Sequence, residues 1–147
     1  MIEGMKNLLL LLTFLVIAGC ATGPVRYKDA SPIPDDNLLE GYSKYAQQQE
    51  GSVRVIVVRD WEFLGGGYAI KLRINGVSVA KFWSSQRLEL FLMPGGYVFR
   101  LETPTLDLAG TNEEEFQIKS GASYIFRIEP KWLSGYSLQE SSLPKSK

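Results

Sequence analysis

The chain has 147 residues, with 16 lysines and arginines, 16 aspartates and glutamates, no histidine and a single cysteine, Cys20. The balanced charge argues against nucleic acid as a partner and against electrostatic attachment to anionic lipids. Without histidine or a second cysteine, histidine-based catalytic triads, histidine-ligated zinc and an intrachain disulfide are excluded. The length allows one domain with a hydrophobic core.

The N-terminal segment has the pattern of an export signal. Residues 8–18 form an uncharged, mostly apolar run that fits the ~7–15 residues of a signal-peptide core and falls short of the about 20 needed to span a membrane. Glu3 is unusual before such a run, so translation from Met5 is an alternative to Met1. The run ends in Ile17-Ala18-Gly19-Cys20, which resembles the lipobox of bacterial lipoprotein signal peptides.

This resemblance implies that residues 1–19 are removed by cleavage between Gly19 and Cys20, and that the Cys20 sulfur and the new amino terminus are lipidated. Several acyl chains would make release from a membrane negligible, because each buried methylene contributes about 0.8 kcal/mol. Ala21, rather than an aspartate, follows the cysteine and implies the periplasmic face of the outer membrane. The alternatives are a plain signal peptide before a chance cysteine, or a buried apolar helix.

Residues 20–50 are predicted to form a tether between the lipidated cysteine and the domain. Up to residue 34 they show no apolar period and contain several prolines, so they would let the domain stand off the bilayer. A short helix is predicted over residues 36–47, with a solvated spacer as the alternative. Its apolar residues at helical spacing are Leu38, Leu39, Tyr42, Tyr45 and Ala46.

From residue 51 the pattern changes to short strands separated by turn residues. Asn75-Gly76 predicts a type I′ hairpin turn, because both positions of that turn need positive φ. The predicted strands are residues 53–59, 68–74, 77–82, 87–92, 97–102, 114–119 and 123–129. They predict an all-β fold, a single antiparallel β-sandwich of immunoglobulin or transthyretin type over residues 51–130, followed by a C-terminal tail over residues 131–147.

Two of the predicted strands are close copies of each other. Tyr97-Val98-Phe99-Arg100-Leu101-Glu102 recurs as Tyr124-Ile125-Phe126-Arg127-Ile128-Glu129. Because side chains alternate along a strand, the tyrosine, phenylalanine and aliphatic positions share one face of each copy. The copies are predicted to play equivalent roles in the sandwich and to bury their aromatic faces; a binding stripe on the charged face is the alternative.

Several turns of this region resemble those of the domain of unknown function called DUF2846, whose members are mostly bacterial and often lipoproteins. The resemblance covers residues 51–129 and rests on the strand 53–59, Gly65-Gly66-Gly67, Ile74-Asn75-Gly76, Met93-Pro94-Gly95-Gly96-Tyr97 and Gly121-Ala122-Ser123-Tyr124. It implies a fold and a lipid anchor, and it implies no catalytic residues.

Aromatic residues crowd one predicted loop. Trp61, Phe63 and Tyr68 flank the three glycines, and exposed aromatic loops are frequent binding sites. Alternatively, Trp61 and Phe63 plug the open end of the sandwich core. The glycines precede a strand rather than a helix, so they do not predict a phosphate site, and no cofactor is expected.

The sequence thus predicts a non-enzymatic, lipid-anchored envelope protein that acts as a binding or accessory module, with an envelope protein as partner. A carbohydrate- or peptidoglycan-binding module is one alternative. A weak carboxylate-based hydrolase is another, since acidic clusters occur at Asp35-Asp36 and at residues 113–115. The second cluster also fits the hydrophilic edge of a sheet.

Overall fold

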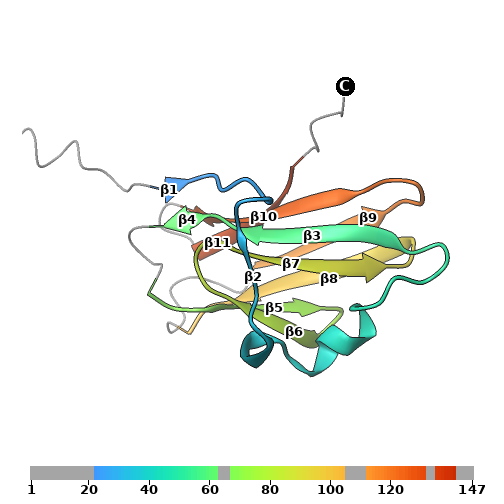
Figure 1. The fold of residues 1–147 in the computed structure, drawn as a ribbon, viewed down its shortest axis with the longest axis horizontal. Coiled ribbons are helices and arrows are strands. Elements are labelled where there is room, and N and C mark those ends of the chain that lie inside the picture. Colours follow the sequence, from blue (N-terminus) through green and yellow to red (C-terminus); the bar gives the residue numbers. More distant parts are fainter. Residues whose placement is uncertain (1–21, 63–66, 105–111, 132–134, 142–147) are drawn as a thin grey trace, which may run out of the picture.

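A computed structural model describes residues 22–62, 67–104, 112–131 and 135–141. Two sheets pack face to face (Figure 1), with strand orders β11-β10-β3-β7-β2 and β6-β5-β8-β9. The predicted all-β sandwich is therefore confirmed. Its elements are β1 (Thr22–Gly23), β2 (Ser31–Pro32), η1 (Asp35–Asn37), η2 (Glu40–Lys44), β3 (Val53–Arg59), β4 (Trp61–Glu62), β5 (Ile70–Ile74), β6 (Val77–Phe82), β7 (Gln86–Leu92), β8 (Gly95–Glu102), β9 (Asn112–Ile118), β10 (Tyr124–Lys131) and β11 (Gly135–Ser141).

Each of the predicted strands corresponds to one of the longer strands, with small differences at the ends. The hairpin between β5 and β6 turns at Asn75 and Gly76, which have φ of 48° and 79°, as the type I′ turn requires. Most strand pairs are antiparallel, but β3 and β10 run parallel, as do β2 and β7. The chain crosses from the four-stranded to the five-stranded sheet between β9 and β10, and this crossover gives β10 the direction of β3.

The two copies of the sequence repeat meet across the core. Phe99 lies on β8 in one sheet and Phe126 on β10 in the other, and their ring centroids are 5.3 Å apart. Phe116 of β9 packs on Phe126 with a centroid distance of 4.6 Å. The prediction that both copies bury their aromatic faces is therefore confirmed, and the repeat supplies facing positions of one core.

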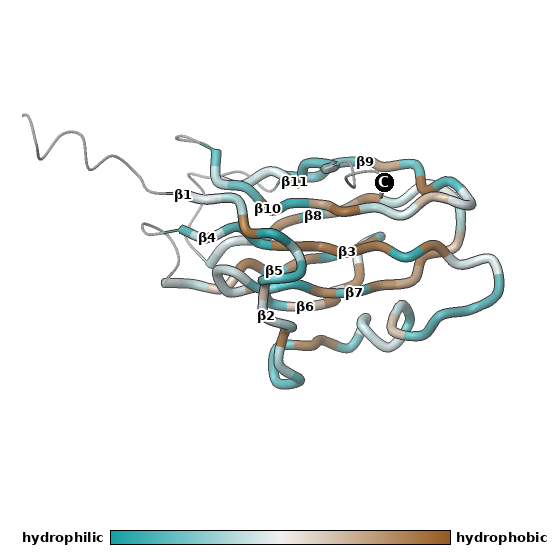
Figure 2. Tube along the Cα trace, turned by 45° about the horizontal axis from the view of Figure 1, so that its top comes forward, coloured by the Kyte–Doolittle hydropathy of each residue, from teal (hydrophilic) through white to brown (hydrophobic). Residues whose placement is uncertain are grey.

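The N-terminal segment corrects the prediction of a free tether. β2 pairs with β7, and the Ile33 N–H donates to the Arg87 carbonyl at 3.0 Å. Val25, Tyr27 and Ala30 cover a second apolar cluster on the outer face of the five-stranded sheet, formed by Ile56, Val58 and Ile125. Figure 2 shows that most of β3 is hydrophobic. A strand that is apolar on both faces needs cover on both, and the supposed tether provides it.

The single helix predicted over residues 36–47 is instead two short 3-10 turns, η1 and η2. The Leu39 N–H donates to the Val79 carbonyl, and the Phe91 N–H donates to the Tyr45 carbonyl. These bonds to the sandwich take the place of a continuous helical ladder. Gly41 lies so close to β6 that an added Cβ would stand 2.7 Å from the Ser78 carbonyl oxygen, so this segment is fitted to the sheet edge.

The C-terminal part corrects the prediction that the sandwich ends near residue 130. β11 pairs with β10 along its whole length, from Gly135 opposite Lys131 to Ser141 opposite Ile125. Tyr136 and Leu138, two residues apart on this strand, are both buried in the core. The tail expected over residues 131–147 therefore includes an edge strand.

Candidate functional site

The predicted cleavage and lipidation site, Gly19 and Cys20, lies outside the described residues. The described chain begins at Thr22, where β1 pairs with β4, Thr22 opposite Glu62 and Gly23 opposite Trp61. Within the described residues no helix is long and apolar enough to cross a membrane.

The residues of the predicted binding loop have different environments. Trp61 is 42% exposed, so it does not plug the core. Tyr68 is partly buried, and its hydroxyl lies 3.0 Å from that of Tyr136. Phe63 lies outside the described residues. Strand alternation explains the first result, because Glu62, the neighbour of Trp61 in β4, is the residue that points inward.

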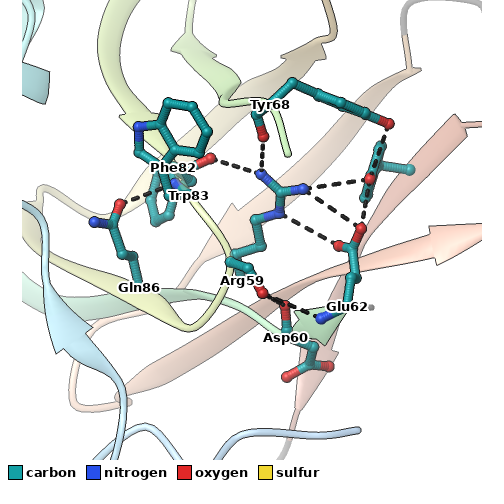
Figure 3. Close-up of polar contacts among 9 residues, drawn as sticks. Arg59, Asp60, Glu62, Tyr68, Phe82, Trp83 and Gln86 are labelled. Atoms are coloured by element: carbon teal, nitrogen blue, oxygen red, sulfur yellow. Dashed lines mark hydrogen bonds and ion pairs between the residues drawn. The ribbon is translucent and has the colours of Figure 1, made fainter. Parts of the chain in front are cut away.

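The end of the core is filled by a polar cluster that the sequence analysis missed, the Arg59 cluster: Arg59, Glu62, Tyr68 and Tyr136. Arg59 is fully buried and donates from Nη1 to the carbonyl oxygens of Tyr68 at 2.7 Å and Phe82 at 2.8 Å. Its Nε and Nη2 face the Glu62 carboxylate at 3.3 and 3.4 Å. Figure 3 shows the guanidinium lying between these carbonyls and the carboxylate.

Tyrosines complete the cluster. The Tyr136 hydroxyl donates to Glu62 Oε2 at 2.6 Å, and the rings of Tyr68 and Tyr136 lie 5.7 and 5.3 Å from the Arg59 guanidinium carbon, within cation–π range. Burial, together with the hydrogen bond to Glu62, raises the pKa of Tyr136 far above its usual range. Tyr136 therefore stays protonated and serves as a donor to the buried carboxylate.

A pattern in the sequence could have revealed this cluster. Val53, Val55 and Val57 are buried on one face of β3 and belong to the main core. With a period of two, Arg59 is the next residue on that face, so the strand itself directs an arginine inward. A buried arginine requires a carboxylate and carbonyl partners, and Glu62 is the nearest acidic residue that shares its direction.

The opposite face of the same strand end carries a second, partly buried ion pair. Asp60 Oδ1 accepts from Arg127 Nη1 at 2.6 Å and from the Val25 N–H at 3.0 Å. Arg127 Nη1 also donates to the Val25 carbonyl at 2.9 Å. Figure 3 shows the Asp60 side chain pointing away from the Arg59 guanidinium. This pair fastens the N-terminal segment to β10 and β3.

A serine connects β4 to the turn between β6 and β7. Ser84 Oγ accepts from the Glu62 N–H at 3.1 Å and donates to the Asp60 carbonyl at 3.4 Å. Trp83, the neighbour of Ser84, is 41% exposed. Trp61 and Trp83 therefore lie at one end of the sandwich, called here the tryptophan end, which is also where β1 begins.

The acidic clusters noted in the sequence are not assembled into a site. Asp35 and Asp36 are exposed in η1, while Glu113 and Glu115 are exposed on the edge strand β9. Glu114 accepts a hydrogen bond from the Leu138 N–H at 3.1 Å. The interpretation of residues 113–115 as a hydrophilic strand edge agrees with this placement. Across the described ranges, no group of three acidic or sulfur-bearing residues is placed to hold a metal ion.

Comparisons with known proteins assign no family to the chain. No family model matches it, and no curated protein matches it.

Proposed function

We propose that this chain is a lipid-anchored protein of the bacterial cell envelope that acts by binding rather than by catalysis. The observation that carries the proposal is the position of the lipobox-like Ile17-Ala18-Gly19-Cys20. Its cysteine lies two residues before β1, which pairs with β4 at one end of the folded sandwich. A lipid on Cys20 would join directly to the domain. Ala21 at the following position supports sorting to the outer membrane. Membership of the DUF2846 family stays a prediction from the sequence.

A binding role is supported by the finding that the buried charged side chains at the tryptophan end are hydrogen-bonded within the protein. Arg59, Asp60 and Glu62 are buried, and each is held by partners from the protein itself, which favours a structural role for them. The large apolar side chains that are exposed in the described structure are Trp61, Trp83, Met93 and Val98. Exposed residues of this kind are the natural candidates for contact with another molecule.

Labelling of living cells tests the anchor. The full chain and its Cys20→Ala variant are produced in a bacterial host fed with an alkyne-bearing palmitate, and the label is followed by gel fluorescence. We expect label on the native chain and none on the variant. Equal labelling, or none on either, would refute the lipid anchor.

Photo-crosslinking tests the accessory role. A benzophenone amino acid is placed at positions 61, 83, 93 and 98 in turn, so that both ends of the sandwich are sampled. We expect a protein adduct of defined mass from at least one position in intact cells. Its absence at every position would contradict a role in a protein assembly.

A glycan-binding module is the second candidate, because Trp61 and Trp83 offer two exposed aromatic rings at one end. Co-sedimentation with purified peptidoglycan tests it. Binding that is lost in Trp61→Ala and retained in Met93→Ala would support this candidate.

A further inference from the structure

We propose that the tryptophan end of the sandwich rests on the lipid bilayer, with Trp61 and Trp83 in its interfacial layer. The proposal rests on the lipid anchor at Cys20 and deepens it, because it names the surface that the anchored domain turns toward the membrane. The occupant of this surface is a phospholipid bilayer.

The predicted lipid anchor is separated from the folded domain by a single residue. Ala21 alone separates Cys20 from Thr22, and Thr22 and Gly23 are paired with β4. The pairing is reinforced at Val25, whose N–H and carbonyl are both hydrogen-bonded, to Asp60 and Arg127. Acyl chains on Cys20 would therefore enter the bilayer close to the start of β1, because one residue separates the lipidated cysteine from that strand. A flexible tether would leave the orientation of the domain on the membrane undefined. The β1–β4 pairing and the hydrogen bonds of Val25 restrict that orientation.

The end of the sandwich beside the anchor carries two exposed tryptophans. Trp61 pairs with Gly23 across β1 and β4, and glycine has no side chain to cover the indole. Trp83 is attached to the same end through Ser84, which hydrogen-bonds to both neighbours of Trp61 in the chain. Tryptophan concentrates at membrane interfaces, because its ring is apolar and its N–H can reach water or headgroups.

Met93 lies at the opposite end of the sandwich from Trp61. Met93 directly follows Leu92, the last residue of β7, which pairs with Val53 at the start of β3. Trp61 instead lies just beyond the end of β3. A strand of this length spans about 20 Å, so Met93 is carried away from the bilayer. Its side chain is 47% exposed and is left for contacts in the periplasm.

The charge of the chain distinguishes this contact from electrostatic adsorption. Basic and acidic residues are equal in number, 16 each, so attraction to anionic headgroups is weak. Attachment through acyl chains and two interfacial rings should therefore depend little on the fraction of anionic lipid.

Depth-dependent fluorescence quenching tests the proposal. The lipidated full-length protein is purified in two forms, one retaining only Trp61 and one retaining only Trp83, with phenylalanine at the other tryptophan positions. The matched control carries Met93→Trp with phenylalanine at all three native tryptophans. Each protein is reconstituted into vesicles of phosphatidylethanolamine and phosphatidylglycerol that contain phosphatidylcholine brominated near the carbonyl end of its acyl chains. Mass spectrometry first confirms the acyl chains.

We expect the brominated lipid to lower the emission of Trp61 and Trp83 about twofold, and to leave the control nearly unchanged. Acylated, vesicle-bound protein whose Trp61 is quenched no more than the control would overturn the proposal and leave the lipid anchor intact. Protein without acyl chains would instead refute the anchor itself. Protection of Trp61 by purified peptidoglycan, without quenching by lipid, would assign this end to a glycan and also overturn the proposal.

A second measurement avoids the substitutions. Amide hydrogen exchange of the unmodified sequence is compared between the vesicle-bound lipidated protein and the same mature chain without acyl groups. Slower exchange at residues 60–62 and 82–86, with unchanged exchange at residues 92–96, supports the proposal. Equal slowing at both ends contradicts it.

Discussion

The hydroxyl of Tyr136 donates a 2.6 Å hydrogen bond to Oε2 of Glu62, although 74 residues separate them in the chain. The bond joins β11 to β4, and Arg59 of β3 contacts both residues. One arginine, one carboxylate and one phenol thus connect the adjacent strands β3 and β4 to the distant strand β11 beneath the tryptophan end. Because the groups are buried, the loss of any one removes a hydrogen-bond partner from the others in a medium of low dielectric constant.

Tyr136→Phe should destabilise the fold by about 1–3 kcal/mol, because the substitution leaves the buried Glu62 carboxylate without one of its donors. Urea denaturation measures the change. Tyr45→Phe is the matched control, because Tyr45 and Tyr136 are both 4% exposed, and the Tyr45 hydroxyl has no hydrogen-bond partner within the described structure. We expect the control to be neutral or stabilising. Equal losses in the two variants would contradict the assigned role of the cluster.

Arg59→Met should cost about 3–5 kcal/mol, because it leaves a buried carboxylate without its counter-ion. The control is Arg54→Met. Arg54 forms an ion pair with Glu89 at 2.6 Å, in which both side chains are almost half exposed, and such surface pairs contribute about 0–1 kcal/mol. Differential scanning calorimetry and urea titration should rank the two variants in this order. A small loss in both would show that Arg59 is not required by the core.

The stability should fall at alkaline pH through Tyr136. Burial and the bond to Glu62 raise its pKa in the folded protein above the ordinary value of 10.0. Its contribution is therefore complete below pH 10 and is lost above it, as the unfolded chain releases a proton that the folded protein retains, with a slope of up to about 1.4 kcal/mol per pH unit. Urea midpoints at about pH 8 and about pH 11 measure the loss. Tyr136→Phe should show a shallower loss than the native chain, and an identical slope would contradict this assignment.

Arg127→Met should loosen the N-terminal segment without unfolding the sandwich. The substitution removes one bond to the Val25 carbonyl and the counter-ion of Asp60, so residues 23–27 should exchange their amide hydrogens faster while β5 and β8 stay protected. Hydrogen-exchange mass spectrometry resolves the two regions. Unchanged exchange at residues 23–27 would show that the apolar cover on Ile56 and Val58 is enough to hold the segment.

The sandwich was predictable because its information is local. The alternation along β3 and β5 and the Asn75-Gly76 turn each specify a strand or a turn within a few residues. The placement of residues 22–34 was not predictable from the sequence. Prolines and the absence of an apolar period are equally typical of a linker and of a segment that covers a sheet. That segment is held by Ile56, Val58 and Ile125, which lie far along the chain.

The surroundings of Trp61 and Tyr68 were predicted only in part, because they depend on contacts between residues that are far apart in the sequence. Trp61 was predicted to belong to a binding loop or to plug the core, and its exposure, which argues against the plug, follows from the inward direction of Glu62. The role of Tyr68 depends on Tyr136, which lies in a strand that the sequence analysis treated as a tail. Along β11 buried and exposed residues do not alternate regularly, so its pairing with β10 was not visible from its pattern.

Mass spectrometry of the N-terminal peptide of the mature protein, purified from bacterial envelopes, decides whether the chain is lipid-anchored. We expect a peptide that begins at Cys20 and carries a diacylglyceryl group on sulfur and an acyl chain on nitrogen. An unmodified Cys20, or a mature chain that still contains residues 1–19, would contradict it.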